Sequence, residues 1–216
     1  EVEWSAPCRM VVEGSFEKNV TVKSHGSDGN GNATHLFFSG NPSKFLQGHN
    51  IFGSDDLVAL MVDTYDSVCR YLELIPALTN FNQVRAGDYR LTRLDINNSF
   101  ELDSRSDVLA WLRAAEYKSK TRHGRPSSKG GSLYYGKGSK RWELVAYCKA
   151  EEVQVPKHRL PDSLLDTPLI PWVDNKLRIE LRLKSKELDE LNLSKAYSWL
   201  PRTAMTTYFD YLKRLN

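Results

Sequence analysis

The sequence predicts an α+β fold in which a central antiparallel sheet is flanked by helices. Three segments alternate polar and apolar residues, as half-buried strands do because successive side chains point to opposite faces. They are YRLTRLDINNSFEL (89–102), RWELVAYCKA (141–150) and NKLRIELRLK (175–184). Segments with helical periodicity stand before and between them, so helices are available to cover the apolar strand faces. If the three strands share one sheet, the face opposite the apolar one carries the charged side chains.

The elements that precede these strands form a hairpin followed by a helix. Residues 16–24 and 34–39 are predicted to pair through a long, Gly- and Asn-rich loop. Residues 39–53 then form a short, turn-rich connection. A helix is expected from Ser54, because a capping residue and acids in the first turn precede a stripe of apolar residues.

The remaining segments supply shorter elements. A second amphipathic helix is expected over 104–119, capped by Ser104 or Ser106. The basic, glycine-containing loop 118–131 carries no acid, which fits either a solvated loop or one that closes on a phosphate backbone. Residues 155–172 hold too many prolines for a long helix, and residues 194–216 form two short helices broken at Pro201.

The polar faces of the three strands carry the candidate catalytic residues. Asp95 lies on the first, Tyr147 with Lys149 on the second and Glu180 on the third. Two acids on neighbouring strands can bind a hard divalent cation, which prefers oxygen ligands. A solvated outer face gives the same pattern in any one strand, and on this arginine-rich face each acid can instead pair with a nearby arginine.

A tyrosine in this setting suggests covalent phosphodiester chemistry. Its pKa of about 10 makes the phenolate about 4 kcal/mol unfavourable at neutral pH, and a cation such as Lys149 lowers that cost. A tyrosine nucleophile preserves the energy of the phosphodiester bond for later rejoining. Tyr147 also fits a strand aromatic whose hydroxyl is hydrated, and Tyr134 and Tyr135 are rival nucleophiles.

Composition excludes several classes of protein. A chain of 216 residues with 40% hydrophobic content can bury one core, and we expect a single domain over 1–216. No apolar run is long enough for a membrane span, no secretion signal is present and no glycine-rich phosphate loop is present, so neither membrane nor nucleotide cofactor is expected.

Cys8, Cys69 and Cys148 fit reduced thiols of an intracellular protein. The net charge of +3 is too mild to identify a nucleic-acid partner.

Residues 39–57, SGNPSKFLQGHNIFGSDDL, resemble a segment of the gene II replication initiators of filamentous bacteriophages. The resemblance continues in order through TRLD (92–95), LVAYCKAEEV (144–153) and LRIELRLKSKEL (177–188) and covers most of the chain. The later motifs are also similar to those of plasmid rolling-circle initiators. The chain ends soon after the third motif, so a catalytic core truncated from a longer protein is expected.

The resemblance implies a site-specific single-strand nickase and ligase that starts rolling-circle replication. Tyr147 would attack and remain on the 5′ phosphate while the free 3′ hydroxyl primes synthesis, with Lys149 and Glu152 beside it. Asp95, Glu180 and His49 would hold Mg²⁺ or Mn²⁺. The DNA contacts are expected from Lys44, Gln47, Asn50, Arg93, Arg141, Arg178 and Arg182. The expected partners are single-stranded and origin DNA, with host helicase and polymerase, in the cytoplasm of the bacterial host.

One departure from the wider class of tyrosine nickases concerns the metal ligands. Those enzymes present a His-hydrophobe-His pair, which this chain lacks. Our hypothesis is a divergent enzyme of that class with rearranged strand order, in which acids replace the histidines. Two alternatives remain: a DNA-binding repressor module without turnover, and a metal nuclease that uses water.

Overall fold

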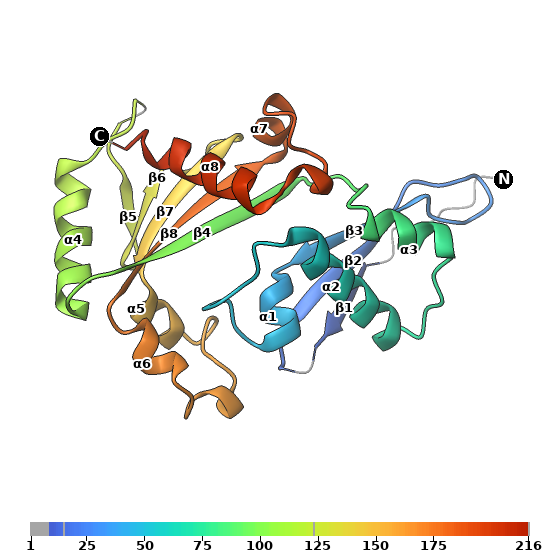
Figure 1. Ribbon diagram of the computed structural model, residues 1–216, viewed down its shortest axis with the longest axis horizontal. Coiled ribbons are helices and arrows are strands. Elements are labelled where there is room, and N and C mark those ends of the chain that lie inside the picture. Colours follow the sequence, from blue (N-terminus) through green and yellow to red (C-terminus); the bar gives the residue numbers. More distant parts are fainter. Residues whose placement is uncertain (1–8, 15, 123, 216) are drawn as a thin grey trace. The chain divides into compact units, whose positions relative to one another are not determined.

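The chain divides into two compact units in the computed structural model, which describes residues 9–14, 16–122 and 124–215 (Figure 1). The first unit comprises Glu1–Ser54 and Val58–Arg85, and the second comprises Asp55–Leu57 and Ala86–Asn216. The sequence predicted one domain over 1–216. Each unit is described by itself.

The first unit is a three-stranded antiparallel sheet with helices. Its strands are β1 (Arg9–Glu13), β2 (Asn19–His25) and β3 (His35–Gly40), in the order β1-β2-β3. Its helices are α1 (Pro42–Gln47), α2 (Leu57–Tyr71) and α3 (Leu78–Arg85). Val12, Val20 and Val22 of the sheet form the core with Phe45 of α1 and Val68 of α2. The hairpin and the helix after Ser54 are therefore confirmed, and β1 is a strand that the sequence analysis missed.

Helix α1 replaces part of the predicted turn-rich connection. The side chain of Asn41 accepts the Lys44 backbone N–H and so caps the helix, and Pro42 occupies the first turn, where its fixed φ suits a helix. The helix ends at Gln47, and its C-cap residue is Gly48, whose φ of 79° is left-handed. A Cβ there would lie 2.9 Å from the Phe16 ring, so both conformation and space favour glycine.

The second unit contains a five-stranded antiparallel sheet in the order β4-β8-β7-β6-β5. Its strands are β4 (Arg93–Glu101), β5 (Ser127–Lys129), β6 (Ser132–Tyr135), β7 (Trp142–Cys148) and β8 (Lys176–Lys184). The three strands predicted from alternation are β4, β7 and β8, with β8 in the middle. The prediction that they share one sheet is confirmed.

Helices cover the apolar face of this sheet. The unit contains α4 (Arg105–Lys118), α5 (Lys149–Gln154), α6 (Leu169–Val173), α7 (Ser185–Glu190) and α8 (Pro201–Leu212), with 3₁₀ turns at Asp162–Leu164 and Ala196–Ser198. Leu144, Leu181 and Leu183 are fully buried, and the ring of Trp142 meets that of Tyr211 from α8 at 5.2 Å. Figure 1 shows α4 and α8 running beside the sheet. The predicted α+β class with a helix-flanked antiparallel sheet is confirmed.

Two boundaries differ from the prediction. β7 ends at Cys148, so Lys149 is the first residue of α5 and does not continue the strand face of Tyr147. The tail contains a 3₁₀ turn and one helix of 12 residues, and Pro201 begins that helix because the first turn needs no backbone N–H donor. Cys8 and His123 lie outside the described residues. Within the described part of the chain, none of the helices has the length and apolarity that crossing a membrane requires.

Candidate active site

Tyr147 lies near the end of β7 with its hydroxyl directed at a carboxylate. Its Oη donates a hydrogen bond of 2.5 Å to Oε1 of Glu180 on β8. In the register, Tyr147 faces Arg178 and Glu180 faces Val145, so the bonded pair is diagonal across neighbouring strands on one sheet face. Tyr147 is only 6% exposed. The two strands therefore place a buried phenol against a buried acid.

Glu180 begins a chain of ion pairs that crosses to the edge strand β4. Its Oε2 accepts a hydrogen bond of 3.0 Å from Arg182, whose Nε lies 3.9 Å from Oδ2 of Asp95. Asp95 in turn receives two hydrogen bonds from Arg93, of 2.8 and 2.6 Å. The arginine pairing that the sequence left open for both acids is therefore present. Cations and acids alternate along this sheet face, in the order Arg93, Asp95, Arg182 and Glu180, which contacts Tyr147.

Arg182 also carries a polar group without a hydrogen-bond acceptor. Among the described residues, its Nε is buried and makes no hydrogen bond, although Asp95 is close enough for an ion pair. A buried donor in that state is unfavourable by about 1–3 kcal/mol unless another acceptor reaches it. The oxygen of a bound anion would satisfy this donor.

Burial raises the pKa of Tyr147 well above its usual value, and the negative charges of Glu180 and Glu152 raise it further, while Arg178 opposes them. Burial also acts to raise the pKa of Glu180, but the hydrogen bonds from Tyr147 and Arg182 outweigh it and the pKa is lowered overall. The proton therefore stays on the phenol in this arrangement. Deprotonation requires a change in the contacts of Glu180 or of the phenol itself.

Arg178 is a buried cation beside Tyr147, on the neighbouring strand β8. It lies directly opposite Tyr147 in the sheet, is 2% exposed, and its Nε donates a hydrogen bond of 2.9 Å to Oγ of Ser99 on β4. The predicted role of Arg178 as a DNA contact stays a prediction, and its position here makes it an electrostatic neighbour of the phenol.

Lys149, Glu152 and His158 form a second cluster beside the tyrosine. Lys149 is fully buried, and its Nζ pairs with Oε2 of Glu152 at 2.6 Å and lies 5.9 Å from the centre of the Tyr147 ring. Oε1 of Glu152 lies 3.3 Å from Nδ1 of His158. The motif resemblance identified Lys149 and Glu152 as neighbours of Tyr147. His158 was missed because a single histidine in a proline-rich segment carries no periodic signal.

The Gln47-Gly48-His49-Asn50 segment contains the last residue of α1 and the start of the bend that follows it in the first unit. The side chain of Gln47 donates to the carbonyl oxygens of Phe52 and His49, at 2.9 and 3.3 Å. Nδ1 of His49 accepts the Ile51 N–H at 3.3 Å, so a metal-ligand role would fall to Nε2. These contacts give the segment a structural role in holding the bend.

The predicted metal ligands, Asp95, Glu180 and His49, stay a prediction. The described residues contain no group of three or more His, Cys, Asp and Glu placed to hold an ion. Asp95 and Glu180 supply oxygen atoms of the kind that Mg²⁺ prefers, but each is engaged by an arginine. A cation at this place would have to displace those arginines.

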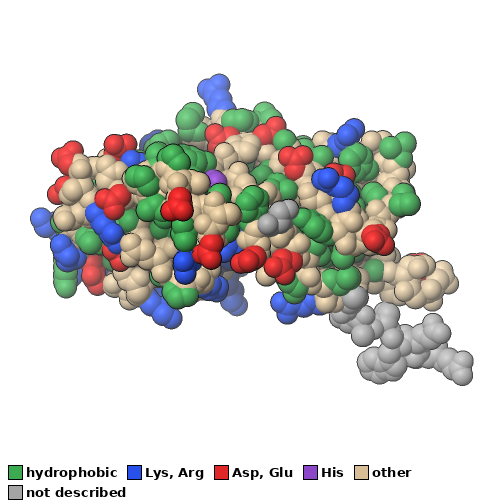
Figure 2. All heavy atoms as spheres, turned by 90° about the horizontal axis from the view of Figure 1, so that it is seen from below, with side chains coloured by type: hydrophobic (Ala, Val, Ile, Leu, Met, Phe, Trp, Pro, Cys, Tyr) green, Lys and Arg blue, Asp and Glu red, His purple; other side chains and the backbone are tan. Residues whose placement is uncertain are grey.

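The remaining predicted DNA contacts differ in their surroundings. Arg141 pairs with Glu187 and, at 2.5 Å, with Glu190 of α7, which ties the start of β7 to that helix. Lys44, Gln47 and Asn50 lie in and after α1, all partly exposed. On the face that Figure 2 presents, Lys and Arg side chains are interspersed with Asp and Glu. This face therefore shows no single large basic patch, and the predicted DNA contacts stay predictions.

The two rival tyrosines lie on opposite faces of β6. Tyr135 is buried on the apolar face, where its hydroxyl and Oγ of Ser119 are 2.7 Å apart. Tyr134 pairs with Val145 in the register and so shares the sheet face of Tyr147. Among these three tyrosines, the hydrogen bond to an acid distinguishes Tyr147.

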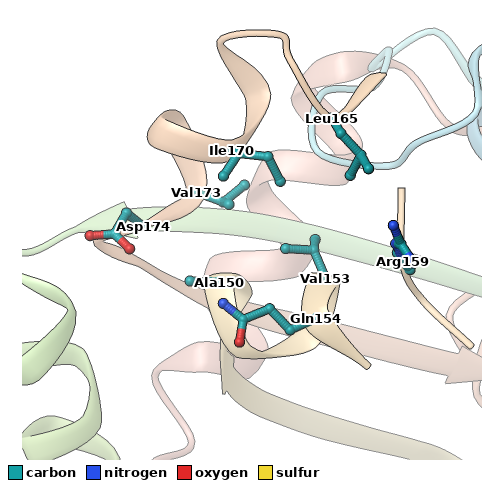
Figure 3. Close-up of a pocket in the computed structure, with 8 residues that line it drawn as sticks. All are labelled: Ala150, Val153, Gln154, Arg159, Leu165, Ile170, Val173 and Asp174. Carbon is teal, nitrogen blue, oxygen red and sulfur yellow. The ribbon is translucent and has the colours of Figure 1, made fainter. Parts of the chain in front are cut away.

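A cavity of about 380 Å³ lies between α5 and α6 (Figure 3). Val153, Ile170 and Val173 form apolar walls, and the side chains of Arg159 and Asp174 stand at opposite sides. Helix α5 thus carries Lys149 and Glu152 and also forms one wall of this cavity. The walls contain no cluster of catalytic groups.

Comparisons with known proteins agree on one family. A family model that describes the N-terminal part of a phage replication-associated protein matches residues 1–202. The replication-associated protein of Enterobacteria phage I2-2 is 48% identical over 216 residues, which make up 99% of this chain and 63% of that protein. The chain therefore spans less than two thirds of the length of this relative. No solved structure matches the chain.

Proposed function

The chain belongs to this family of phage replication-associated proteins, as its motifs predicted, and we propose that it is a site-specific single-strand DNA nickase and ligase that starts rolling-circle replication. The family supports a role in replication initiation. The nicking and joining chemistry is our inference from the side chains that surround Tyr147 on its sheet face.

In the proposed reaction, Oη of Tyr147 attacks the scissile phosphorus. An Oη–P bond forms and the P–O3′ bond breaks, which leaves a 5′-phosphotyrosine and a 3′ oxygen. The phenol proton passes to Oε1 of Glu180, which already accepts the hydrogen bond. The departing 3′ oxygen takes a proton from water, to which Glu180 later releases the proton that it accepted. The reverse sequence, in which a 3′ hydroxyl attacks the phosphotyrosine, rejoins the strand.

Phosphate binding would also change the electrostatics around Glu180. The guanidinium groups of Arg182 and Arg93 are suited to phosphate oxygens, and Arg182 has a buried N–H without a hydrogen-bond acceptor among the described residues. If a phosphate draws Arg182 from Glu180, the carboxylate loses a hydrogen bond that favours its ionised form. The carboxylate of Glu180 then binds a proton more tightly, which favours transfer of the proton from the phenol of Tyr147.

One observation carries the proposal: the buried hydroxyl of Tyr147 donates a 2.5 Å hydrogen bond to Glu180 on an arginine-rich sheet face. A solvated strand aromatic would not need this partner. Lys149 and Arg178, both buried beside the ring, would offset negative charge that develops on the phenol oxygen.

A divalent cation, Mg²⁺ or Mn²⁺, remains part of the proposal because the family resemblance implies it. Such an ion supplies charge compensation at the phosphate. The arrangement of Asp95 and Glu180 does not fit an ion without rearrangement, so no step above depends on it. The proposed partners are single-stranded and origin DNA, with host helicase and polymerase, in the bacterial cytoplasm.

The test is a denaturing gel of the protein with labelled single-stranded origin DNA and Mn²⁺. We expect a labelled band of protein size that disappears in Tyr147→Phe and persists in Tyr134→Phe, which removes a hydroxyl from the same sheet face. A parallel lane with chelator tests the need for the cation.

Other outcomes would select the alternatives. Cleaved DNA without the protein-sized band would indicate a nuclease that uses water. Intact DNA that shifts on a native gel equally with the wild type and Tyr147→Phe would indicate a binding module without turnover. Either result would contradict the nickase proposal.

A further inference from the structure

The three-stranded sheet of the first unit has one face that its helices do not cover. Val12, Val20 and Val22 point to the side where Phe45 and Val68 pack. Because neighbouring strand residues point oppositely, Val11 and Phe37 belong to the other side. They are 60% and 39% exposed, which is consistent with an open face.

The register places two cations and an aromatic ring in one row across this face. Arg9 on β1 faces Lys23 on β2, and Lys23 faces Phe37 on β3. All three are exposed. Strands lie about 4.8 Å apart, so the ring and the two charges occupy one line across the sheet.

The adjoining rows add polar groups with little negative charge. His25 and His35 form the next row on the side of the long hairpin loop. On the other side, Thr21 and Ser39 form a row with Val11. Among the described residues of β1, β2 and β3, one acidic residue, Glu13, belongs to this face.

We propose that this open face, the row Arg9–Lys23–Phe37 and its neighbours, is a binding platform for a segment of single-stranded DNA. Exposed aromatic rings on a sheet stack unpaired bases, and adjacent cations contact the phosphates, so an anionic chain with unstacked bases complements the face. A duplex keeps its bases stacked inside and cannot use the ring in this way. The platform goes beyond the proposed nicking and requires no cleavage.

The experiment measures binding without chemistry. The Tyr147→Phe protein in EDTA is titrated against labelled oligothymidylate, with fluorescence anisotropy as the readout. Phe37→Leu keeps an apolar side chain but removes the π face, and we expect the dissociation constant to rise about 5-fold or more. Phe37→Tyr should restore tight binding.

The cations are tested through the salt dependence. Lys23→Gln should weaken binding and reduce the slope of log K against log salt by about 0.7, the value for one phosphate contact with a single strand. Two matched controls lie in the other unit. Phe209→Leu removes a ring that is 38% exposed, and Lys186→Gln removes an exposed lysine; neither should change the affinity.

Three results would overturn the platform. One is equal affinity of Phe37→Leu and Phe209→Leu, with circular dichroism showing that both are folded. Another is an equal loss of affinity for oligothymidylate and for heparin, a polyanion without bases, because the face would then bind anionic partners without stacking. The third is tighter binding to a duplex than to the single strand. None of these depends on whether Tyr147 cuts DNA.

Discussion

Tyr147 and Glu180 are linked because antiparallel strands bring a residue close to its diagonal neighbour on the next strand. The phenol and the carboxylate are 33 residues apart in the sequence, and their atoms are 2.5 Å apart in the structure. Burial favours the protonated phenol and the arginine contact favours the ionised acid. Under the proposed function, this pair holds the proton until phosphate alters the contacts of Arg182.

Glu180→Gln tests the role of the carboxylate as the proton acceptor. A glutamine keeps the size of the side chain and can still meet the hydroxyl, but it does not take up the proton. We expect the rate of adduct formation to fall about 10²- to 10⁴-fold with DNA affinity little changed. Single-turnover gel kinetics measure the rate.

Glu143→Gln is the matched control for that variant. Glu143 lies on the same sheet face and pairs with Lys184 at 2.8 Å instead of with Tyr147. It should retain most of the adduct-forming rate. Equal losses in Glu180→Gln and Glu143→Gln would show that any acid lost from this face has the same effect.

The ion pair of Lys149 and Glu152 should stabilise the fold in a way that depends on both partners. Lys149 is fully buried, whereas the Glu152 side chain is 17% exposed, so the larger loss should follow removal of the acid: we expect Glu152→Leu to lower the free energy of unfolding by about 3–5 kcal/mol. The double variant Lys149→Met, Glu152→Leu should recover part of this loss. Urea unfolding of Lys149→Met, Glu152→Leu and the double variant measures the coupling energy, and strictly additive losses would contradict the coupling.

At the scale of single elements, local capping chemistry determines where helices begin. The sequence offered Ser104 and Ser106 as caps for α4, and the structure selects Ser104, whose Oγ accepts the Asp107 backbone N–H at 3.2 Å. Helix α5 begins at Lys149 without a side-chain cap, although the alternation of β7 suggested that the strand continued. Two glutamates in the first turn of α5 favour its helix.

Ser104→Ala should destabilise the second unit more than Ser106→Ala does. Loss of the cap should lower the free energy of unfolding by about 1 kcal/mol. Ser106 lies inside the helix and is exposed, so alanine there should be neutral or slightly stabilising. Denaturant melts of the two variants measure the difference, and an equal effect would argue against Ser104 as the cap.

At the scale of the whole molecule, each unit contains its own sheet and buried apolar residues. All the described tryptophans, Trp111, Trp142, Trp172 and Trp199, belong to the second unit. Tryptophan fluorescence therefore reports mainly on the second unit, whereas far-ultraviolet circular dichroism reports on both. The two signals can separate the stabilities of the units.

Gly48→Ala should affect the first unit selectively. Its left-handed φ and the nearby Phe16 ring make alanine unfavourable, and we expect a loss of about 1–3 kcal/mol. The circular dichroism transition should shift or broaden while the fluorescence transition remains in place. Gly53→Ala, where a Cβ meets Ser43 Oγ at an ordinary 3.6 Å, is the control. Equal shifts of both signals would mean that the two units unfold together.

Much of the fold and of the site follows from local patterns. Alternation identified β4, β7 and β8, and because side chains of a strand alternate between faces it also predicted that Asp95, Tyr147 and Glu180 share one face. Motif resemblance identified the family that the comparisons show. The metal ligands and DNA contacts stay predictions.

The sequence by itself determined the periodicity of the strands, the candidate nucleophile and the family, because each depends on residues that are close together in the chain. Only the tertiary structure decided that β8 lies between β4 and β7, that Glu180 receives the Tyr147 hydroxyl, and that Arg93 and Arg182 engage the two acids. Strand order and cross-strand register depend on packing between distant segments. No local pattern of residues specifies which neighbour a side chain will meet there.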